Sequence, residues 1–350
     1  MAPSKPVTAL MQQSKHVCGV AVIDGFDIAW SRIAGGAPDR LFQAGSVSKP
    51  VTALAALELA ARGEVDLDGD VNERLTSWQV PGPERISLGH LLGHTSGMGV
   101  PFFPGYPQGA DVPTLPEVLA GTPPSRTPVV RVDPAKYGKF SYSGGGYAVV
   151  QQLIEDVTGV PFAEAARGLV LEPLGMSHST FEQPLPTELR AAAAREDWHV
   201  YPESGAAGLW TTPDDLARYV GSLQAALAGQ TSVVRAETAA EMLTARMPLP
   251  AAGEWSALPL LGLRPPDSYG LGLFLYGSER FGHFGGAASF FSAIAGSKQD
   301  GSGVVIMMAS NASPFPFKLL RAISDELGWS GFRLPAWQRW RGLRGLRYLA

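Results

Sequence analysis

Segments with strand patterns lie at both ends of this 350-residue chain and helical patterns lie between them, and this order constrains the fold more than any other feature. Near the N-terminus the β-rich runs 17–23 and 26–33 are separated by Asp24-Gly25, a favoured two-residue hairpin turn. Further β-rich runs, separated by glycine-containing turns, follow at 269–276, 280–284, 289–295 and 304–309. We therefore predict an antiparallel sheet to which both chain termini contribute strands.

Helical patterns fill the middle of the chain. Residues 46–62 are rich in alanine and leucine at helical spacing, and Gly63 follows as a stop signal. Further helices are predicted at 147–158, 162–170, 213–227 and 316–327. The predicted fold class is α/β (α+β): residues 1–75 and 246–350 form a sheet lobe flanked by helices, residues 76–245 form a mostly helical inserted lobe, and the functional site lies in the cleft between them.

The charge pattern argues against a nucleic-acid partner. The formal net charge is −4, and the chain has neither zinc-finger spacing nor a basic recognition helix. No run of about 18 apolar residues occurs, so no membrane span is expected, and residues 1–13 lack a continuous apolar stretch of signal-peptide length. We expect a cytoplasmic protein.

Two features outside the predicted site have simple structural interpretations. Cys18 is the only cysteine and lies in an apolar β-rich run, so it is expected to be a buried core residue rather than a catalytic thiol. Residues 333–347 contain five arginines and two tryptophans. We interpret this tail as packed or solvated, with a weak contact to an anionic surface or a partner as the alternative.

The segment that carries chemistry is Gly45-Ser46-Val47-Ser48-Lys49-Pro50, at the start of the alanine-rich helix. Ser46 and Lys49 are three residues apart and share a face of the helix. A serine hydroxyl is a weak nucleophile that needs a basic neighbour, and a helix N-terminus supplies N–H groups where an oxyanion would form. Alternatively, Ser46 is a helix cap and Lys49 a solvated charge. The strongly apolar helix that follows favours the catalytic interpretation.

Beyond this segment, the chain resembles a family of serine hydrolases that includes penicillin-binding proteins, class C β-lactamases, D-aminopeptidases and related esterases. The resemblance runs from about residue 17 to about residue 327. Besides Ser46-x-x-Lys49, the segments that carry it, in the family's order, are 91–97 with His94-Thr95-Ser96-Gly97, Tyr142-Ser143-Gly144, Pro173-Leu174-Gly175-Met176, 208–213, Tyr269-Gly270-Leu271-Gly272 and His283-Phe284-Gly285. It implies a β-lactamase/transpeptidase-like fold.

The resemblance also assigns roles to the site residues. Tyr142 would face Ser46 with Lys49 near both, so that positive charge favours the phenolate. Tyr142 would then take the serine proton and return it to the leaving group, while Lys49 stabilises this charge distribution or shares the base role. Taken alone, Tyr142 would be an ordinary core aromatic.

The strand motif beginning at His283 is expected to bind substrate. His283 stands where many relatives carry lysine, and it could bond the phenol or a substrate carboxylate, being cationic only below about pH 6.5 if unperturbed; otherwise it is a hydrogen-bonded strand histidine. Gly285 and Gly286 would let the acyl group lie against the strand edge, and the Gly286 N–H would pair with that of Ser46 as an oxyanion hole.

Gly144 is the main departure from the family pattern. It stands where lactamases and peptidases of the family present an asparagine amide to the substrate. Because glycine has no side chain, the amide donor of that asparagine is absent here. We therefore expect a roomier or more ester-like substrate site around Gly144.

Metal and other hydrolase sites are not favoured. His90 and His94 have metal-ligand spacing, but the glutamate of a metalloprotease helix is missing and Gly93 predicts a turn. No Gly-x-Ser-x-Gly elbow of an α/β-hydrolase is present; residues 175–179 lack the final glycine. We expect neither a metal ion nor a cofactor.

The predicted function is hydrolysis of a small-molecule ester, amide, lactam or peptide through an acyl-Ser46 intermediate. Two alternatives remain at this stage. An acyltransferase or cyclase would pass the acyl group to an amine or alcohol, and a non-catalytic binding or sensor domain would bind a donor without turnover.

Overall fold

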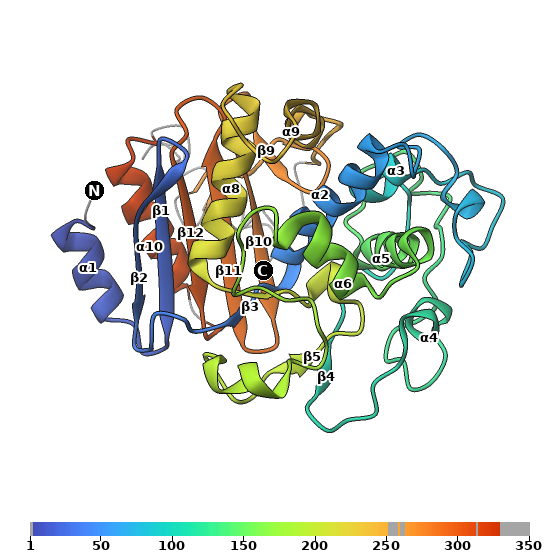
Figure 1. Ribbon diagram of the computed structural model, residues 1–350, viewed down its shortest axis with the longest axis horizontal. Coiled ribbons are helices and arrows are strands. Elements are labelled where there is room, and N and C mark those ends of the chain that lie inside the picture. Colours follow the sequence, from blue (N-terminus) through green and yellow to red (C-terminus); the bar gives the residue numbers. More distant parts are fainter. Residues whose placement is uncertain (1–2, 251–257, 260–262, 313, 330–350) are drawn as a thin grey trace, which may run out of the picture.

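The computed structural model describes residues 3–250, 258–259, 263–312 and 314–329, and its centre is an eight-stranded sheet (Figure 1). The strand order is β2-β1-β12-β11-β10-β9-β8-β7, and all neighbouring strands are antiparallel. The strands are β1 Cys18–Asp24, β2 Asp27–Ala34, β7 Met247–Pro248, β8 Ser268–Tyr269, β9 Phe274–Tyr276, β10 Arg280–Ala287, β11 Phe290–Ser297 and β12 Gly303–Met308. The predicted antiparallel sheet formed from both ends of the chain is confirmed.

The join between the two ends of the chain is the pairing of β1 with β12. Cys18 lies opposite Met308 and Val22 opposite Val304. Side chains alternate between the two faces of each strand: Val20 of β1 belongs to the core under the terminal helices, whereas Ala21 belongs to the core on the other side. Both faces of these strands are therefore buried, which explains their nearly continuous apolar sequences.

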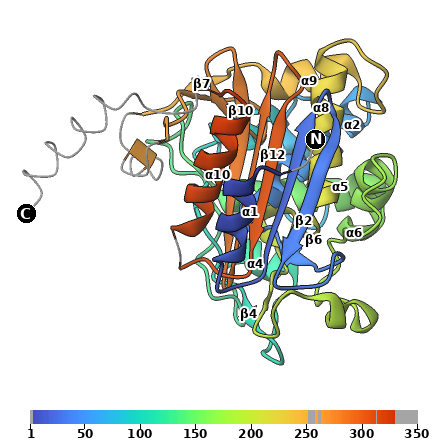
Figure 2. The same ribbon diagram turned by 90° about the vertical axis from the view of Figure 1, so that its left-hand side faces the viewer.

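Helices cover both faces of the sheet (Figure 2). The N-terminal α1 (Lys5–Gln12) and the C-terminal α10 (Phe315–Glu326) lie on one face, where Val7 and Leu319 are buried in the same apolar cluster. On the other face α8 (Pro213–Leu227) crosses β2, β1, β12 and β11. Although α8 comes from the middle of the chain, it packs on the sheet. The division into two lobes stays a prediction.

The alanine-rich helix α2 (Ser48–Ala61) is buried on nearly all sides, as expected for a helix without a polar face. Four helices pack against it: α5 Gly144–Thr158, α6 Phe162–Ala166, α7 Ser204–Ala207 and α9 Ala236–Leu243. Two others, α3 Leu88–Leu92 and α4 Leu115–Ala120, pack against α5. Two short ladders, β3 (Phe42–Gln43) with β6 (Trp210–Thr211) and β4 (Tyr106–Pro107) with β5 (His199–Val200), complete the described strands.

Three predicted elements differ from the observed ones. The predicted strand 269–276 is a hairpin of β8 and β9, because Gly272 adopts a φ of 91° and reverses the chain. The predicted helix 162–170 ends as α6 at Ala166 and continues as a π-helical turn, Arg167–Leu171. The helix predicted from residue 46 begins at Ser48, and a 3₁₀ turn, Gly45–Val47, precedes it.

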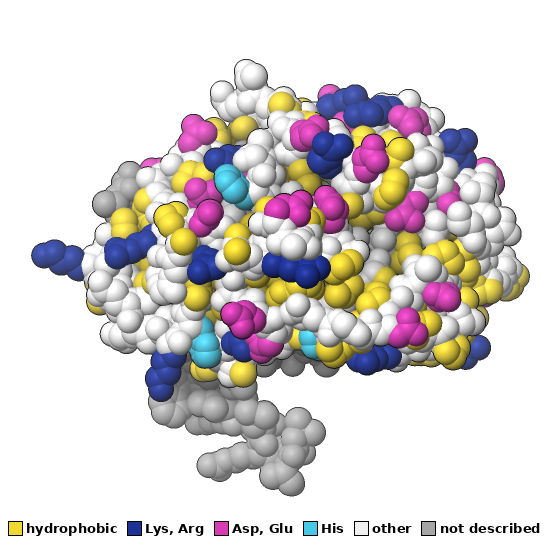
Figure 3. Space-filling model, turned by 60° about the horizontal axis from the view of Figure 1, so that its bottom comes forward, with side chains coloured by type: hydrophobic (Ala, Val, Ile, Leu, Met, Phe, Trp, Pro, Cys, Tyr) yellow, Lys and Arg dark blue, Asp and Glu magenta, His cyan; other side chains and the backbone are white. Residues whose placement is uncertain are grey.

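Several other expectations can be compared with the structure. Cys18 is buried, and burial raises the pKa of its thiol to about 12, as fits a core residue. On the face seen in Figure 3, acidic and basic side chains are interspersed rather than gathered by sign. Within the described part of the chain, no helix is both long and apolar enough to cross a membrane. The arginine-rich tail 333–347 lies outside the described residues.

Candidate active site

Ser46 lies in the 3₁₀ turn between β3 and α2, pressed against the backbone of β10. Gly45 has a φ of 51°, and a Cβ there would collide with the backbone of Gly286. Only glycine meets both conditions without strain. This close approach explains the glycine before Ser46 and sets Ser46 beside the strand that carries His283.

Lys49 lies one turn further along, and its ammonium group is enclosed by polar partners. Its Nζ donates to Ser46 Oγ over 3.0 Å and to the Ala206 carbonyl over 2.8 Å. The side chain is only 2% exposed. Thr52 on the next turn donates to the Gly205 carbonyl, which holds the α7 segment against α2. The lysine is thus a fixed component of the site rather than a solvated first-turn charge.

Tyr142 reaches the same place from a different segment, the loop before α5. The Nζ of Lys49 lies 5.1 Å from the centroid of the Tyr142 ring. The rings of Phe102 and Phe274 stack on it at interplanar angles of 28° and 6°, with centroids 5.8 and 6.4 Å away. The structure therefore brings Tyr142 to Ser46 and Lys49, although Tyr142 lies more than 90 residues later in the sequence.

His94 fixes the loop that presents Tyr142. Its carbonyl accepts a hydrogen bond from Ser141 N (2.8 Å), and its ring Nδ1 accepts one from Ser143 N (3.1 Å), so His94 binds the backbone on both sides of Tyr142. The His94 and Tyr142 ring centroids are 4.4 Å apart. In the sequence, His94 is marked only as a family motif residue and as a weak metal-ligand candidate, and no local signal indicates this positioning contact.

The electrostatics keep His94 neutral. The side chain is fully buried, and burial, followed by the positive charge of Lys49 and the nearby imidazole of His283, lowers its pKa well below the ordinary value. Because Ser143 N donates to Nδ1, the one proton of the neutral ring lies on Nε2. The hydrogen bond that holds the loop thus persists at neutral pH.

His283 on β10 is also buried and neutral. Its Nδ1 lies 2.7 Å from the Phe284 carbonyl, and since a carbonyl only accepts, Nδ1 carries the proton. The Nε2 lies 3.3 Å from the hydroxyl of Tyr269. Burial, with a smaller contribution from Lys49, lowers the pKa of His283 to about 3. The condition of an unperturbed histidine is therefore not met, and His283 stays neutral at mildly acidic pH.

The two glycines after His283 differ in their surroundings. A Cβ on Gly285 would collide with the Ala44 carbonyl and with Ser292 Oγ, so this position must be glycine for β10 to lie against the Ser46 turn. A Cβ on Gly286 would have no heavy atom within 4 Å, because this residue faces open space. Gly286 therefore borders the cavity beside Ser46, while its role as an oxyanion donor stays a prediction.

Gly144 does not open space for a substrate. A Cβ there would lie 2.9 Å from the Phe103 ring and 3.0 Å from the Pro101 carbonyl, which also accepts a hydrogen bond from Gly144 N. The room that an asparagine side chain would take is therefore filled by Phe103. The expectation of a roomier site at this position was wrong, because it considered the deletion of a side chain without the packing that replaces it.

Ser46 opens into a cavity of about 360 Å³. Its described wall consists of Ser46, Phe102, Tyr142, Leu258, Pro266, Phe274, His283, Phe284, Gly285, Gly286, Phe291, Asn311 and Phe317. The predicted site residues Ser46, Tyr142, His283, Gly285 and Gly286 thus share one wall. Lys49 lies behind Ser46, and Gly144 is not among the wall residues.

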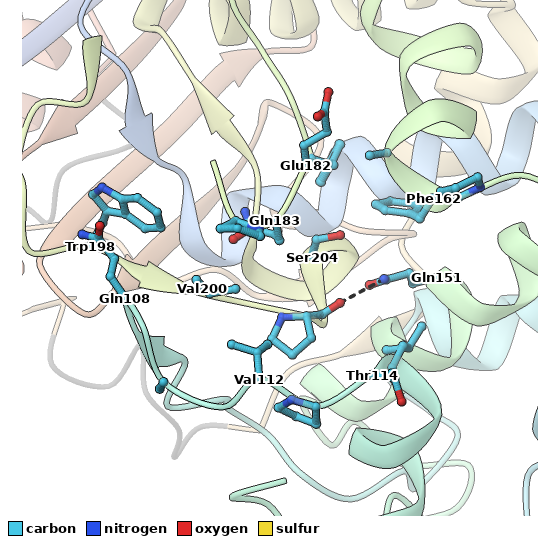
Figure 4. Close-up of a pocket in the computed structure, with 18 of the residues that line it drawn as sticks. Gln108, Val112, Thr114, Gln151, Phe162, Glu182, Gln183, Trp198, Val200 and Ser204 are labelled. Carbon is cyan, nitrogen blue, oxygen red and sulfur yellow. Dashed lines mark hydrogen bonds between the residues drawn. The ribbon is translucent and has the colours of Figure 1, made fainter. Parts of the chain in front are cut away.

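A larger hollow of about 1070 Å³ lies between α4, α6 and β5 (Figure 4). Gln151 projects into it and donates to the Pro202 carbonyl (3.1 Å), while its side-chain oxygen accepts from Gly205 N (2.9 Å). The described residues that line this hollow include no lysine or histidine that could activate a hydroxyl. Gln151 instead supports the segment whose Ala206 carbonyl accepts a hydrogen bond from Lys49.

The two histidines with metal-ligand spacing serve separate structural tasks. His90 Nδ1 accepts from Ser87 N (3.3 Å) in a capping box at the start of α3, whereas His94 binds Ser143. Within the described residues, no group of three or more His, Cys, Asp or Glu side chains could hold a metal ion.

The sequence of this chain is similar to one family model and to several known proteins. The family model described as Beta-lactamase matches residues 7–327. Penicillin-binding protein 4 of Amycolatopsis lactamdurans is 29% identical, with 85% of this chain and 79% of that protein covered. Esterase EstB of Burkholderia gladioli is 30% identical, with 53% of this chain and 58% of the esterase covered.

Solved structures show the same fold at lower identity. The D-amino acid amidase from Ochrobactrum anthropi SV3 superposes with a TM-score of 0.71 at 20% identity, covering 92% of this chain and 99% of the amidase. The octameric penicillin-binding protein homologue from Pyrococcus abyssi gives a TM-score of 0.70 at 24% identity, covering 92% of this chain and 76% of that one. The predicted β-lactamase/transpeptidase-like fold is confirmed.

Proposed function

This chain belongs to the β-lactamase family and is a hydrolase of the β-lactamase and penicillin-binding-protein type, and from that premise we propose that it cleaves an ester, amide or lactam bond through a covalent acyl-Ser46 intermediate. The observation that carries the proposal is the 3.0 Å hydrogen bond from Lys49 Nζ to Ser46 Oγ at the floor of a cavity that Tyr142 also lines. A hydroxyl bound to a buried cation beside a phenol is a typical activated nucleophile.

In the first step, Ser46 Oγ bonds to the substrate carbonyl carbon while its proton passes to the Tyr142 phenolate. The ammonium group of Lys49, 5.1 Å from the Tyr142 ring centroid, favours that phenolate electrostatically. The bond to the leaving group then breaks, and Tyr142 returns the proton to the leaving oxygen or nitrogen. The product of this step is acyl-Ser46.

In the second step, water attacks the acyl-Ser46 carbonyl, with Tyr142 again taking and returning a proton. The carboxylic acid leaves and the Ser46 hydroxyl is restored. We assign the oxyanion hole to the N–H groups of Ser46 and Gly286, since the Gly286 backbone lies against Gly45 and borders the cavity. The larger hollow beside α6 takes no part in these steps.

Intact-protein mass spectrometry tests the proposal directly. Wild type, Ser46→Ala and the control Ser289→Ala, a serine in the β10–β11 turn, are exposed to a fluorophosphonate, a short-chain p-nitrophenyl ester and a penicillin. We expect an adduct on wild type and Ser289→Ala that is absent from Ser46→Ala. Absence of adducts with every reagent, or an adduct that persists on Ser46→Ala, contradicts the proposed nucleophile.

Acyl transfer is separated from hydrolysis by the products. With an ester substrate we expect the free acid to dominate, and an added alcohol or amine to change this product ratio little. Quantitative appearance of the new ester or amide would assign the enzyme to acyl transfer instead.

A further inference from the structure

The cavity in front of Ser46 is lined mainly by apolar side chains. Apart from Ser46, Tyr142, His283 and the glycines, its described wall consists of five phenylalanine rings, one leucine, one proline and one asparagine: Phe102, Phe274, Phe284, Phe291, Phe317, Leu258, Pro266 and Asn311. None of these wall residues is Lys, Arg, Asp or Glu. A charged substrate group entering here would lose its hydration without gaining an ionic partner.

The two polar side chains that border these rings are engaged by the protein itself. His283 is neutral, its Nδ1 donates to the Phe284 carbonyl, and its Nε2 lies beside the Tyr269 hydroxyl. Asn311 uses its amide nitrogen to donate to the carbonyls of Ala287 and Ala288, both over 2.7 Å. An amide NH₂ has two hydrogens, so these two bonds occupy both.

The ammonium group of Lys49, beside Ser46, is also hydrogen-bonded within the protein. Lys49 is 2% exposed and donates to Ser46 Oγ and to the Ala206 carbonyl. It lies behind the nucleophile rather than in the described wall. Drawing it toward a substrate carboxylate would disturb the contacts that activate Ser46.

The rings form two connected groups within the cavity wall. Phe284, Phe291 and Phe317 contact one another with centroids 5.2 to 6.4 Å apart. Tyr142 is stacked with Phe102 and Phe274. Phe102 is 52% exposed, an unusual state for a phenylalanine, and it lies at the cavity that contains Ser46. An apolar acyl chain or ring that binds against these side chains loses its contact with water, which favours its binding.

We infer that the substrate is an uncharged ester whose acyl group is bulky and apolar, held against the phenylalanine wall, and that donors whose acyl group carries a carboxylate are excluded. This inference rests on the proposed acyl-Ser46 function and narrows its substrate class. The selectivity arises from the wall, because the carboxylate would remain unpaired there, and not from the reacting residues.

Two matched esters test the charge selectivity. p-Nitrophenyl hexanoate and the mono-p-nitrophenyl ester of adipic acid have the same leaving group and nearly the same acyl length, but the second ends in a carboxylate. We expect kcat/KM for the hexanoyl ester to exceed that for the adipoyl ester by at least about 100-fold at pH 7.5. The measured ratio is independent of the fraction of active enzyme.

Two neighbouring phenylalanines of α10 test the contribution of the wall. Phe317 lines the cavity and Phe315 does not. In Phe317→Ala the ratio of kcat/KM for p-nitrophenyl hexanoate over p-nitrophenyl acetate should fall about tenfold. In Phe315→Ala that ratio should stay at the wild-type value.

The outcomes separate this inference from the proposed function. If Ser46 is acylated by both matched esters with similar kcat/KM, or the adipoyl ester is preferred, the substrate class is wrong while the acyl-enzyme stands. An equal loss of the hexanoate-to-acetate ratio in both phenylalanine variants also overturns it. If no ester acylates Ser46 and the fluorophosphonate leaves it unmodified, the proposed function itself fails.

Discussion

One part of the cavity wall is held together by directional polar contacts, and the other part by ring packing. Around Ser46, single hydrogen bonds of 2.8 to 3.1 Å position Lys49 and the Tyr142 loop. Around Phe317, ring centroids lie 5.2 to 5.8 Å from their neighbours. A directional contact is lost by changing one atom, whereas ring packing tolerates replacement by another apolar group. The polar part should therefore govern rate for every substrate, and the aromatic part should govern which substrate is used.

The largest expected effect comes from removing the buried charge. Lys49→Met keeps most of the apolar stem and deletes the donor to Ser46 Oγ. We expect kcat/KM to fall by about 10³-fold for both p-nitrophenyl acetate and the hexanoate. Lys298→Met is the matched control, because Lys298 Nζ also donates to a carbonyl, that of Leu243, but away from the cavity. A fall in kcat/KM for the hexanoate alone would contradict the proposal that the polar part governs the rate for every substrate.

The next effect concerns the phenol. Tyr142→Phe keeps the ring that stacks with Phe102 and Phe274 and removes only the hydroxyl. We expect a loss of about 10²-fold in kcat, measured on enzyme normalised by fluorophosphonate titration, with the hexanoate-to-acetate ratio unchanged. Tyr137→Phe, which removes an exposed hydroxyl bonded to the Arg85 carbonyl, is the control. Full activity of the Tyr142 variant would assign proton transfer to another group.

A smaller effect is expected at His94, which acts on Tyr142 through the backbone. His94→Asn retains a side-chain acceptor for Ser143 N and tolerates the φ of 57° at this position, whereas His94→Leu provides neither. We expect kcat per titrated site to fall about 30-fold in His94→Leu and less than about threefold in His94→Asn, with KM changed little in both. Equal losses in the two variants would show that the ring, rather than the accepted hydrogen bond, matters.

The sequence predicted the elements whose signal is local. The β1 hairpin, the sheet strands and the apolar α2 follow from periodicity and turn residues, and the order of the family motifs predicted which residues meet at Ser46. The hairpin of β8 and β9 was missed because Leu271 and Leu273 continue the apolar run through the turn.

The features that the sequence did not predict depend on contacts between distant residues. The role of His94 depends on Ser143, 49 residues away, and the charge state of His283 depends on burial beside Lys49. The space beside Gly144 is filled by Phe103, which no motif marks. The family motifs therefore marked these positions as important, but the protonation and packing of their side chains could not be predicted from them.

The smallest expected effect is on stability and concerns His283, at the border of the two parts. Its pKa in the folded protein, about 3, is below the value of about 6.5 in an unfolded chain, so only the unfolded state gains a proton as the pH falls below 6.5. Stability should therefore decrease with falling pH, by about 1 kcal/mol between pH 7.5 and 5.5, which corresponds to about a tenfold change in the unfolding equilibrium.

Urea unfolding of wild type and His283→Gln at these two pH values isolates that contribution, because His94, whose pKa is also lowered, titrates in both proteins. The glutamine variant should lose about 1 kcal/mol less than wild type over this range. Identical pH dependence in the two proteins would mean that His283 can take up a proton in the folded state. A cation would then be available at the aromatic wall, and the carboxylate-bearing ester should gain relative to the hexanoate at pH 5.5.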